Sequence, residues 1–174
     1  AIDAARDSGA RRGRSPLRWV AAIAAVLAIA ALGAWNVSLQ NDMSRLRDYD
    51  AAMADVLAIA KAPGAKTAVL RSDSGDPAVG LAALDGNGSF AFAVRNLAPT
   101  TGTQVYEVWA VQGERHVPLG SFRVEGSGVA RLVGTVASSP AGMTLGLTRE
   151  PGPDVTTPTL PMILTGPAVA PPPS

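Results

Sequence analysis

The 174-residue sequence contains no cysteine, one histidine and few aromatic residues. Without cysteine the chain has no disulfide, thiolate nucleophile or cysteine-ligated metal. A Ser-His-Asp site would have to use His116, which stands beside a turn without a neighbouring nucleophile or orienting carboxylate. Phosphate-binding glycine loops and metal-ligand motifs are also missing. The sequence therefore predicts that the protein is not an enzyme and has no catalytic residues, no cofactor and no metal site.

An excess of positive charge is found only at the N-terminus. Residues 1–18 hold five arginines, whereas the remainder of the chain is nearly balanced in charge and the whole carries a net charge of +1. A nucleic-acid partner would need a basic stripe on the folded part, so none is expected to bind directly. Residues 1–18 also lack apolar periodicity, which is typical of a flexible linker.

The longest apolar feature is a run without charge from Trp19 to Asn41. Residues 19–39 would form a helix of roughly 31 Å, the thickness of a hydrocarbon core. The N-terminal flank of this run carries five arginines, against Arg45 and Arg47 on the other flank, which predicts a single-pass transmembrane helix over 19–39 with a cytoplasmic N-terminus. Residues 1–18 would then be a cytoplasmic linker, and everything after the helix would be extracytoplasmic. Thirteen arginines against two lysines, with abundant alanine, suggest a GC-rich bacterial genome, so the membrane is expected to be that of a bacterial cell.

Two other interpretations of this run stay open. A secretory signal peptide also has a basic start, but its apolar core is usually about 7–15 residues long. A buried core helix is the second alternative. Against it, tryptophans near both ends of the run, Trp19 and Trp35, fit the interfacial belt of a membrane span better than a buried helix.

A second helix is predicted next to the membrane, over residues 40–62. Its apolar residues follow a 4-3 spacing that is interrupted at Asp50, and Pro63-Gly64 would end it. This apolar stripe would either pack on the domain that follows, which we favour, or pair with another copy of the chain. The stripe consists of Leu39, Met43, Leu46, Met53, Leu57 and Ala60.

From Lys66 onward the sequence changes to short β-prone runs separated by glycine, proline, asparagine and aspartate. No helical pattern separates these runs, so the fold class is mainly β. We expect an antiparallel β-sandwich of about seven or eight strands over residues 66–165, followed by a disordered tail over 166–174. The predicted strands are 66–71, 78–85, 89–95, 104–112, 116–124, 128–136, 142–149 and 159–165.

Three segments of this β region resemble the extracytoplasmic domain of the anti-sigma-K factor family. The first is Val105–Val111 followed by Pro118–Phe122, which is similar to the family's Y-x-[LV]-W-x-V and G-x-F strand pair. Leu145–Gly152 resembles its V-T-x-E-P-G-G segment, and Thr157–Leu164 its P-T-x-P-V-L ending. The resemblance covers roughly residues 16–166 and includes the single membrane helix. Pro153 stands where the family has a glycine.

The resemblance implies a membrane-anchored anti-sigma factor. In such proteins a cytoplasmic domain holds an extracytoplasmic-function sigma factor inactive, and site-specific proteases cutting outside and then within the membrane relieve this negative regulation of transcription. Residues 1–18 are too few to cover a sigma factor, so the holding domain is expected to be absent from this chain. The alternative function is a membrane-tethered binding or adhesion module of the cell envelope.

The family motifs also single out a set of residues whose role we expect to be structural. Trp109 is predicted to be a core anchor on the opposite strand face from Tyr106. Glu150 is expected to face water at the end of a strand, with a signal ligand as its alternative partner. The full set is Tyr106, Trp109, Gly120, Phe122, Thr148, Glu150, Pro151, Pro158 and Thr159.

Overall fold

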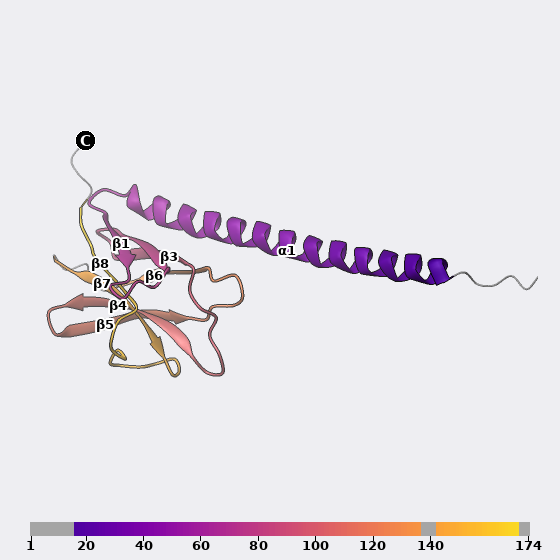
Figure 1. Ribbon diagram of the computed structural model, residues 1–174. Helices are drawn as coiled ribbons and strands as arrows, with labels where there is room; N and C mark the ends of the chain where they lie inside the picture. Colours follow the sequence, from indigo (N-terminus) through magenta and orange to yellow (C-terminus); the bar gives the residue numbers. More distant parts are fainter. Residues whose placement is uncertain (1–15, 137–141, 171–174) are drawn as a thin grey trace, which may run out of the picture. The chain divides into compact units, whose positions relative to one another are not determined.

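A computed structural model describes residues 16–136 and 142–170, with side chains from Leu27 onward (Figure 1). The chain divides into two compact units, residues 1–40 and residues 41–174. We describe each unit by itself. The cytoplasmic linker predicted over residues 1–18 lies largely outside the described residues.

The first unit contributes the start of α1, a helix that runs from Pro16 to Ala60. Large apolar side chains on this part of the helix, from Leu27 to Leu39, are exposed. Among the described residues, no helix is apolar over enough of its length to qualify as a membrane span. The transmembrane helix over 19–39 stays a prediction.

The second unit is mainly β, as the sequence predicts. The described residues contain eight strands, all paired antiparallel, and each begins or ends at the glycine-, proline- or aspartate-rich turns that separate the apolar runs (Figure 1). Their bounds are β1 (Lys66–Arg71), β2 (Val79–Leu84), β3 (Ser89–Arg95), β4 (Val105–Gln112), β5 (Arg115–Phe122), β6 (Ala130–Thr135), β7 (Thr144–Glu150) and β8 (Leu164–Pro167).

The strands form one hydrogen-bonded sheet in the order β5-β4-β7-β8-β1-β2-β3-β6, where the sequence led us to expect a sandwich of two sheets. Short ladders from β8 to both β7 and β1 join the two halves. The sheet is rolled up so that its edge strands, β5 and β6, approach each other. Their closeness is seen at Gly120 of β5, where an added Cβ would lie 3.2 Å from the Leu132 side chain of β6. The fold is therefore a single, nearly closed sheet.

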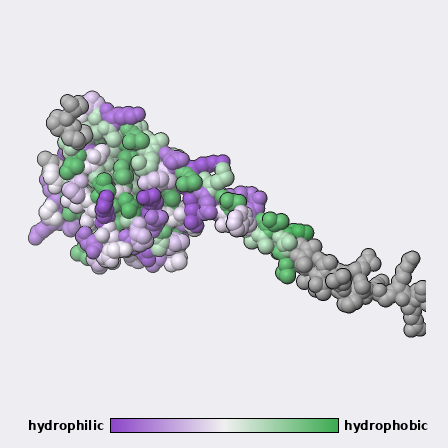
Figure 2. Space-filling model, turned by 45° about the horizontal axis from the view of Figure 1, so that its top comes forward, coloured by the Kyte–Doolittle hydropathy of each residue, from purple (hydrophilic) through white to green (hydrophobic). Residues whose placement is uncertain are grey.

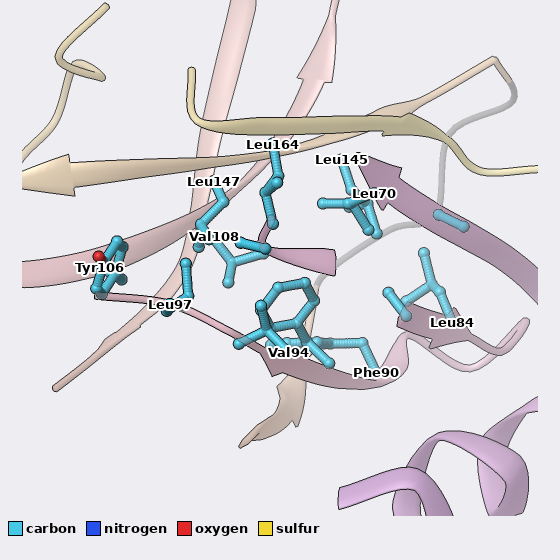
Figure 3. Close-up of a cluster of buried hydrophobic side chains, with 14 of the residues drawn as sticks. Leu70, Leu84, Phe90, Val94, Leu97, Tyr106, Val108, Leu145, Leu147 and Leu164 are labelled. Carbon is cyan, nitrogen blue, oxygen red and sulfur yellow. The ribbon is translucent and has the colours of Figure 1, made fainter. Parts of the chain in front are cut away.

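The inside of this rolled sheet is the hydrophobic core. Figure 3 shows side chains from β1, β2, β3, β4, β7 and β8 converging on one cluster. Tyr106 and Phe122 stack there with ring centroids 5.9 Å apart. Burial of apolar surface at about 25 cal/mol per Å² makes this cluster the main stabilising feature of the unit.

The last part of α1 covers the outer face of β2 and β3. Ala52 and Val56 are buried there against Ala83, Ala91 and Ala93, whose small side chains allow close approach of the helix. The Asp55 carboxylate lies 2.9 Å from the Arg131 guanidinium. The Arg95 guanidinium lies 5.4 Å from the Tyr49 ring centroid, and Arg45 donates a 2.8 Å hydrogen bond to the Gly126 carbonyl. We call the face formed by Tyr49, Ala52 and Val56 the docking face.

The docking face differs from the apolar stripe that we expected to pack on the domain. Of that stripe, Met53 and Ala60 pack against the β unit, and the other residues are exposed. Alanines of the sheet pack around the small Ala52, which lies on a neighbouring side of the helix. The expectation of packing is right for the helix and wrong for most of the stripe.

The C-terminal segment also differs from the prediction. A last strand was expected over 159–165 and disorder from residue 166, but β8 begins at Leu164 and ends at Pro167. Beyond it, Val169 exchanges two backbone hydrogen bonds with Thr67. Gly166 makes this course possible because a Cβ there would lie 2.3 Å from the Val69 carbonyl oxygen. Residues 171–174 of the predicted tail lie outside the described residues.

Candidate functional site

Several of the family-motif residues gather on the outer face of β4 and β7. These strands pair antiparallel, with Glu107 opposite Thr148 and Trp109 opposite Gly146. Alternation along each strand sends Tyr106 and Val108 into the core and leaves Glu107 and Trp109 on the other face. Glu107 and Trp109 are nevertheless buried on that outer face. A polar cluster covered on both sides therefore lies at the centre of this half of the sheet.

A chain of hydrogen bonds connects the cluster and ends on Glu150. The Trp109 indole N–H donates to the Thr148 hydroxyl over 2.8 Å, and that hydroxyl donates to Glu150 Oε1. Thr159 completes the arrangement, with its backbone N–H 2.9 Å from Oε1 and its hydroxyl 2.5 Å from Oε2. Glu150 thus accepts three hydrogen bonds and is only 1% exposed. Our expectation that Glu150 faces water is wrong, because Thr159 returns nine residues later to cap it.

The pKa of Glu150 reflects these partners. Burial alone would raise the pKa of the carboxyl, but the hydrogen bonds from Thr148 and Thr159 outweigh burial together and lower the pKa below its ordinary value. The hydrogen bonds to Glu150 therefore favour the ionised form of its carboxyl. Its charge takes part in fixing the loop that carries Thr159.

Glu107, a second buried carboxyl, stands on the same face. Burial raises the pKa of Glu107 above its ordinary value, and the neighbouring Glu150 and Asp154 carboxylates raise it further, against a hydrogen bond from the Gly120 backbone N–H that lowers it. Gly120 sits at a bulge in the β4–β5 ladder and has a φ of 141°, a conformation that favours glycine. The cluster therefore holds two acids shifted in opposite directions.

The segment between β7 and β8, residues 151–163, closes over this face. We call it the strap. Besides the Thr159 bonds, the Ile163 N–H donates to the Leu147 carbonyl over 2.8 Å, and the Thr103 hydroxyl donates to the Pro151 carbonyl over 2.7 Å. Met162 lies directly over Gly146, where an added Cβ would be 2.3 Å from its sulfur. Pro158 is buried in the strap.

The structure brings five of the nine sequence-predicted site residues together in this cluster. Tyr106 and Phe122 stack on the inner side of the sheet instead, while Pro151 and Pro158 belong to the strap. Sequence reasoning missed Glu107. Its signal was a carboxylate in the middle of a strand that is apolar on both faces. The five residues of the cluster are Trp109, Gly120, Thr148, Glu150 and Thr159.

The hydrogen bonds of the cluster have a structural role. Every buried polar side-chain atom in the described residues has a hydrogen-bond partner, and those residues contain no group of three or more His, Asp or Glu that could hold a metal ion. His116 lies on β5 opposite Val111. These contacts tie the strap to the sheet and leave no free donor or acceptor inside.

These observations define a mainly β domain whose buried polar residues hold its own structure together, with a helix docked on its outer face. A family model described as "Anti-sigma-K factor rskA, C-terminal" matches residues 19–167, and the chain belongs to this family. The resemblance found in the sequence is thereby confirmed. Family membership implies an anti-sigma function, which is regulatory, and a sigma factor as partner. Comparisons with curated proteins and with solved structures gave no match.

Proposed function

We propose that this chain is the membrane-anchored, extracytoplasmic regulatory part of an anti-sigma factor. In this proposal residues 19–39 cross a bacterial cell membrane once, with the N-terminus in the cytoplasm and the β unit outside. The support is the uncharged run of that length and the arginines that precede it. Exposed apolar side chains along the described part of this segment agree with a lipid environment.

The proposed partner is an extracytoplasmic-function sigma factor that the full-length protein holds inactive on the cytoplasmic side. The observation that carries this proposal is the family match over residues 19–167. The chain itself would act as the receiver of an external signal, and no catalysis or direct contact with nucleic acid is required of it.

Regulated proteolysis is the proposed means of release, first outside and then within the membrane. Proteases act on locally opened backbone, so a segment held in a packed helix is protected to the extent that it stays docked. The buried Ala52 and Val56 and the Asp55–Arg131 ion pair hold the end of α1 on the sheet. Undocking this segment is therefore the proposed step that makes the chain cleavable.

Capture of the full-length protein from detergent-solubilised membranes tests the partnership. We expect mass spectrometry to find a sigma factor among the captured proteins. Repeated absence of one, with the protein itself intact, would defeat the proposal and favour a tethered envelope module.

Alkaline carbonate extraction tests the anchor separately. The unaltered protein should stay with the membrane pellet. An arginine at Leu32 costs about 2.5–3.5 kcal/mol in the centre of a span, so Leu32→Arg should shift the protein toward the supernatant, whereas Ser44→Arg, outside the run, should not. Release of the unaltered, uncleaved protein would contradict the anchor.

A further inference from the structure

The helical part of the second unit has an apolar face that the β unit leaves open. Met43, Leu46 and Leu57 are 51%, 66% and 51% exposed. At 3.6 residues per turn this face lies about 100° around the helix from the docking face. Figure 2 shows hydrophobic residues at the surface of the described helix among hydrophilic ones. Both faces can therefore be occupied at the same time.

The spacing of the open face is that of a helix-pairing seam. Met43, Leu46, Met53 and Leu57 occupy alternating heptad positions, with Asp50 filling the position between Leu46 and Met53. Met53 packs against the β unit, so the residues of this pattern that stay open are Met43, Leu46 and Leu57. Apolar residues at this spacing insert between those of a second helix in a two-stranded coiled coil. We call the exposed Met43, Leu46 and Leu57 the seam.

Charges beside the seam favour one orientation of the second helix. Asp42 immediately precedes Met43, and Arg47 immediately follows Leu46, so they hold the two flanking heptad positions that meet across a parallel pair. Neither residue forms an ion pair within the part of the chain that the structure describes. In a parallel pair of identical helices, each Asp42 meets the Arg47 of the other copy, so the contact is made twice.

We propose that the seam pairs two copies of this chain through parallel helices, with each β unit still docked on its own helix. Identical copies satisfy the seam because its apolar residues and its two opposite charges are self-complementary. Asp50 faces its counterpart in this arrangement, and the repulsion keeps the pair weak enough to be reversible. This inference stands on the helix surface and does not depend on the proposed function.

Cysteine cross-linking on the full chain tests the pairing, and the chain offers a background free of cysteine. A disulfide requires Cα atoms about 4.4–6.8 Å apart, a separation that seam positions of paired helices can reach. Leu46→Cys and Met43→Cys should give a covalent homodimer under mild oxidation. The matched control is Ser44→Cys, which is exposed on the same helical turn outside the seam. We expect several-fold more dimer from the seam variants.

Charge changes in the Leu46→Cys background separate specific pairing from chance collision. Arg47→Asp should reduce the dimer several-fold, and adding Asp42→Arg should restore it, since the exchanged charges attract again. Asp50→Leu should increase it. Equal cross-linking of Ser44→Cys and Leu46→Cys, no cross-linking at the seam, or attachment to a different protein would each overturn the proposal. None of these results bears on whether a sigma factor is captured.

Discussion

Glu107 and Glu150 lie on neighbouring strands, yet the pKa values of their carboxyl groups move in opposite directions. Both groups are removed from water, which favours the neutral acid. The difference lies in the donors: two threonines give Glu150 three hydrogen bonds, while Glu107 has the Gly120 N–H and two carboxylate neighbours. Burial is thus the main cause that raises the pKa of Glu107, whereas the hydrogen bonds from the threonines together outweigh burial at Glu150 and lower its pKa.

Glutamine substitutions at these two positions should give opposite dependences on pH. A lowered folded-state pKa stabilises the fold above the ordinary pKa of a glutamate, and this stability is lost as pH falls through the folded value. Glu150→Gln should therefore lower the free energy of unfolding by about 1–3 kcal/mol at neutral pH, and the deficit should shrink in acid. Denaturant unfolding measured at several pH values gives these differences.

Glu107→Gln is the matched comparison. Because the folded-state pKa of Glu107 is raised, the unaltered protein loses stability as pH rises from the ordinary value through the folded one. Over that pH interval the free energy of unfolding of the variant should rise relative to that of the unaltered protein. Deficits with the same sign and the same pH dependence for both variants would contradict these assignments.

The contents of this cluster could be predicted from sequence only in part. Trp109, Thr148, Glu150 and Thr159 stand out through their motifs, but their hydrogen bonds depend on how the strap folds back. The strap has no apolar periodicity from which to read that path. Glu107 could not be placed because a lone acid in an apolar strand is compatible with either an exposed edge or a bonded interior.

At the scale of elements, the docking of α1 depends on small side chains. The outer face of β2 and β3 carries the small side chains of Ala83, Ala91 and Ala93. Ala52 of the helix packs against them and is only 1% exposed. Larger residues at such contacts force the two surfaces apart at a typical cost of about 1–3 kcal/mol. The exposed Asp55–Arg131 pair adds less, since surface ion pairs contribute about 0–1 kcal/mol.

Ala52→Glu should undock the end of α1 while leaving the sheet intact. We expect faster amide hydrogen exchange over residues 49–60 and unchanged exchange in β2 and β3 centres. Ala54→Glu, on an exposed position of the same turn, is the control. If residues 49–60 exchange equally slowly in both variants, the docking face does not hold the helix.

The elements themselves were largely readable from the sequence. Alternating apolar residues and explicit turns placed β1 to β7 within a few residues of their observed bounds. Asp85 shows why, because its carboxylate accepts the Asn87 and Ser89 N–H groups and closes the β2–β3 turn locally. β8 was placed too early because its position depends on contacts with β1 and β7, far away in sequence.

At the scale of the whole molecule, the single sheet depends on β8 fitting between β7 and β1. Gly166 is the critical residue, since a Cβ there would lie 2.3 Å from the backbone oxygen of Val69. Backbone cannot move aside as a flexible side chain can. This close approach explains why a sequence that suggests two sheets folds into one.

Gly166→Ala should therefore lower the free energy of unfolding of the β unit by about 1–3 kcal/mol, the typical cost of an overpacked contact. Gly152→Ala is the control, because nothing lies within 4 Å of a Cβ at that position. Thermal unfolding of the two variants measures the difference. Equal melting temperatures would show that β8 can shift away from β1 at little cost.

The position of β1 in the sheet has a mechanical consequence. This strand follows α1 after a short turn and is hydrogen-bonded to β2 on one side and to β8 on the other. Tension applied along the chain from the helix would load an interior strand and not an edge, so two ladders would have to shear before the sheet opened. The alanine contact of the helix would peel away first, leaving the β unit folded under load.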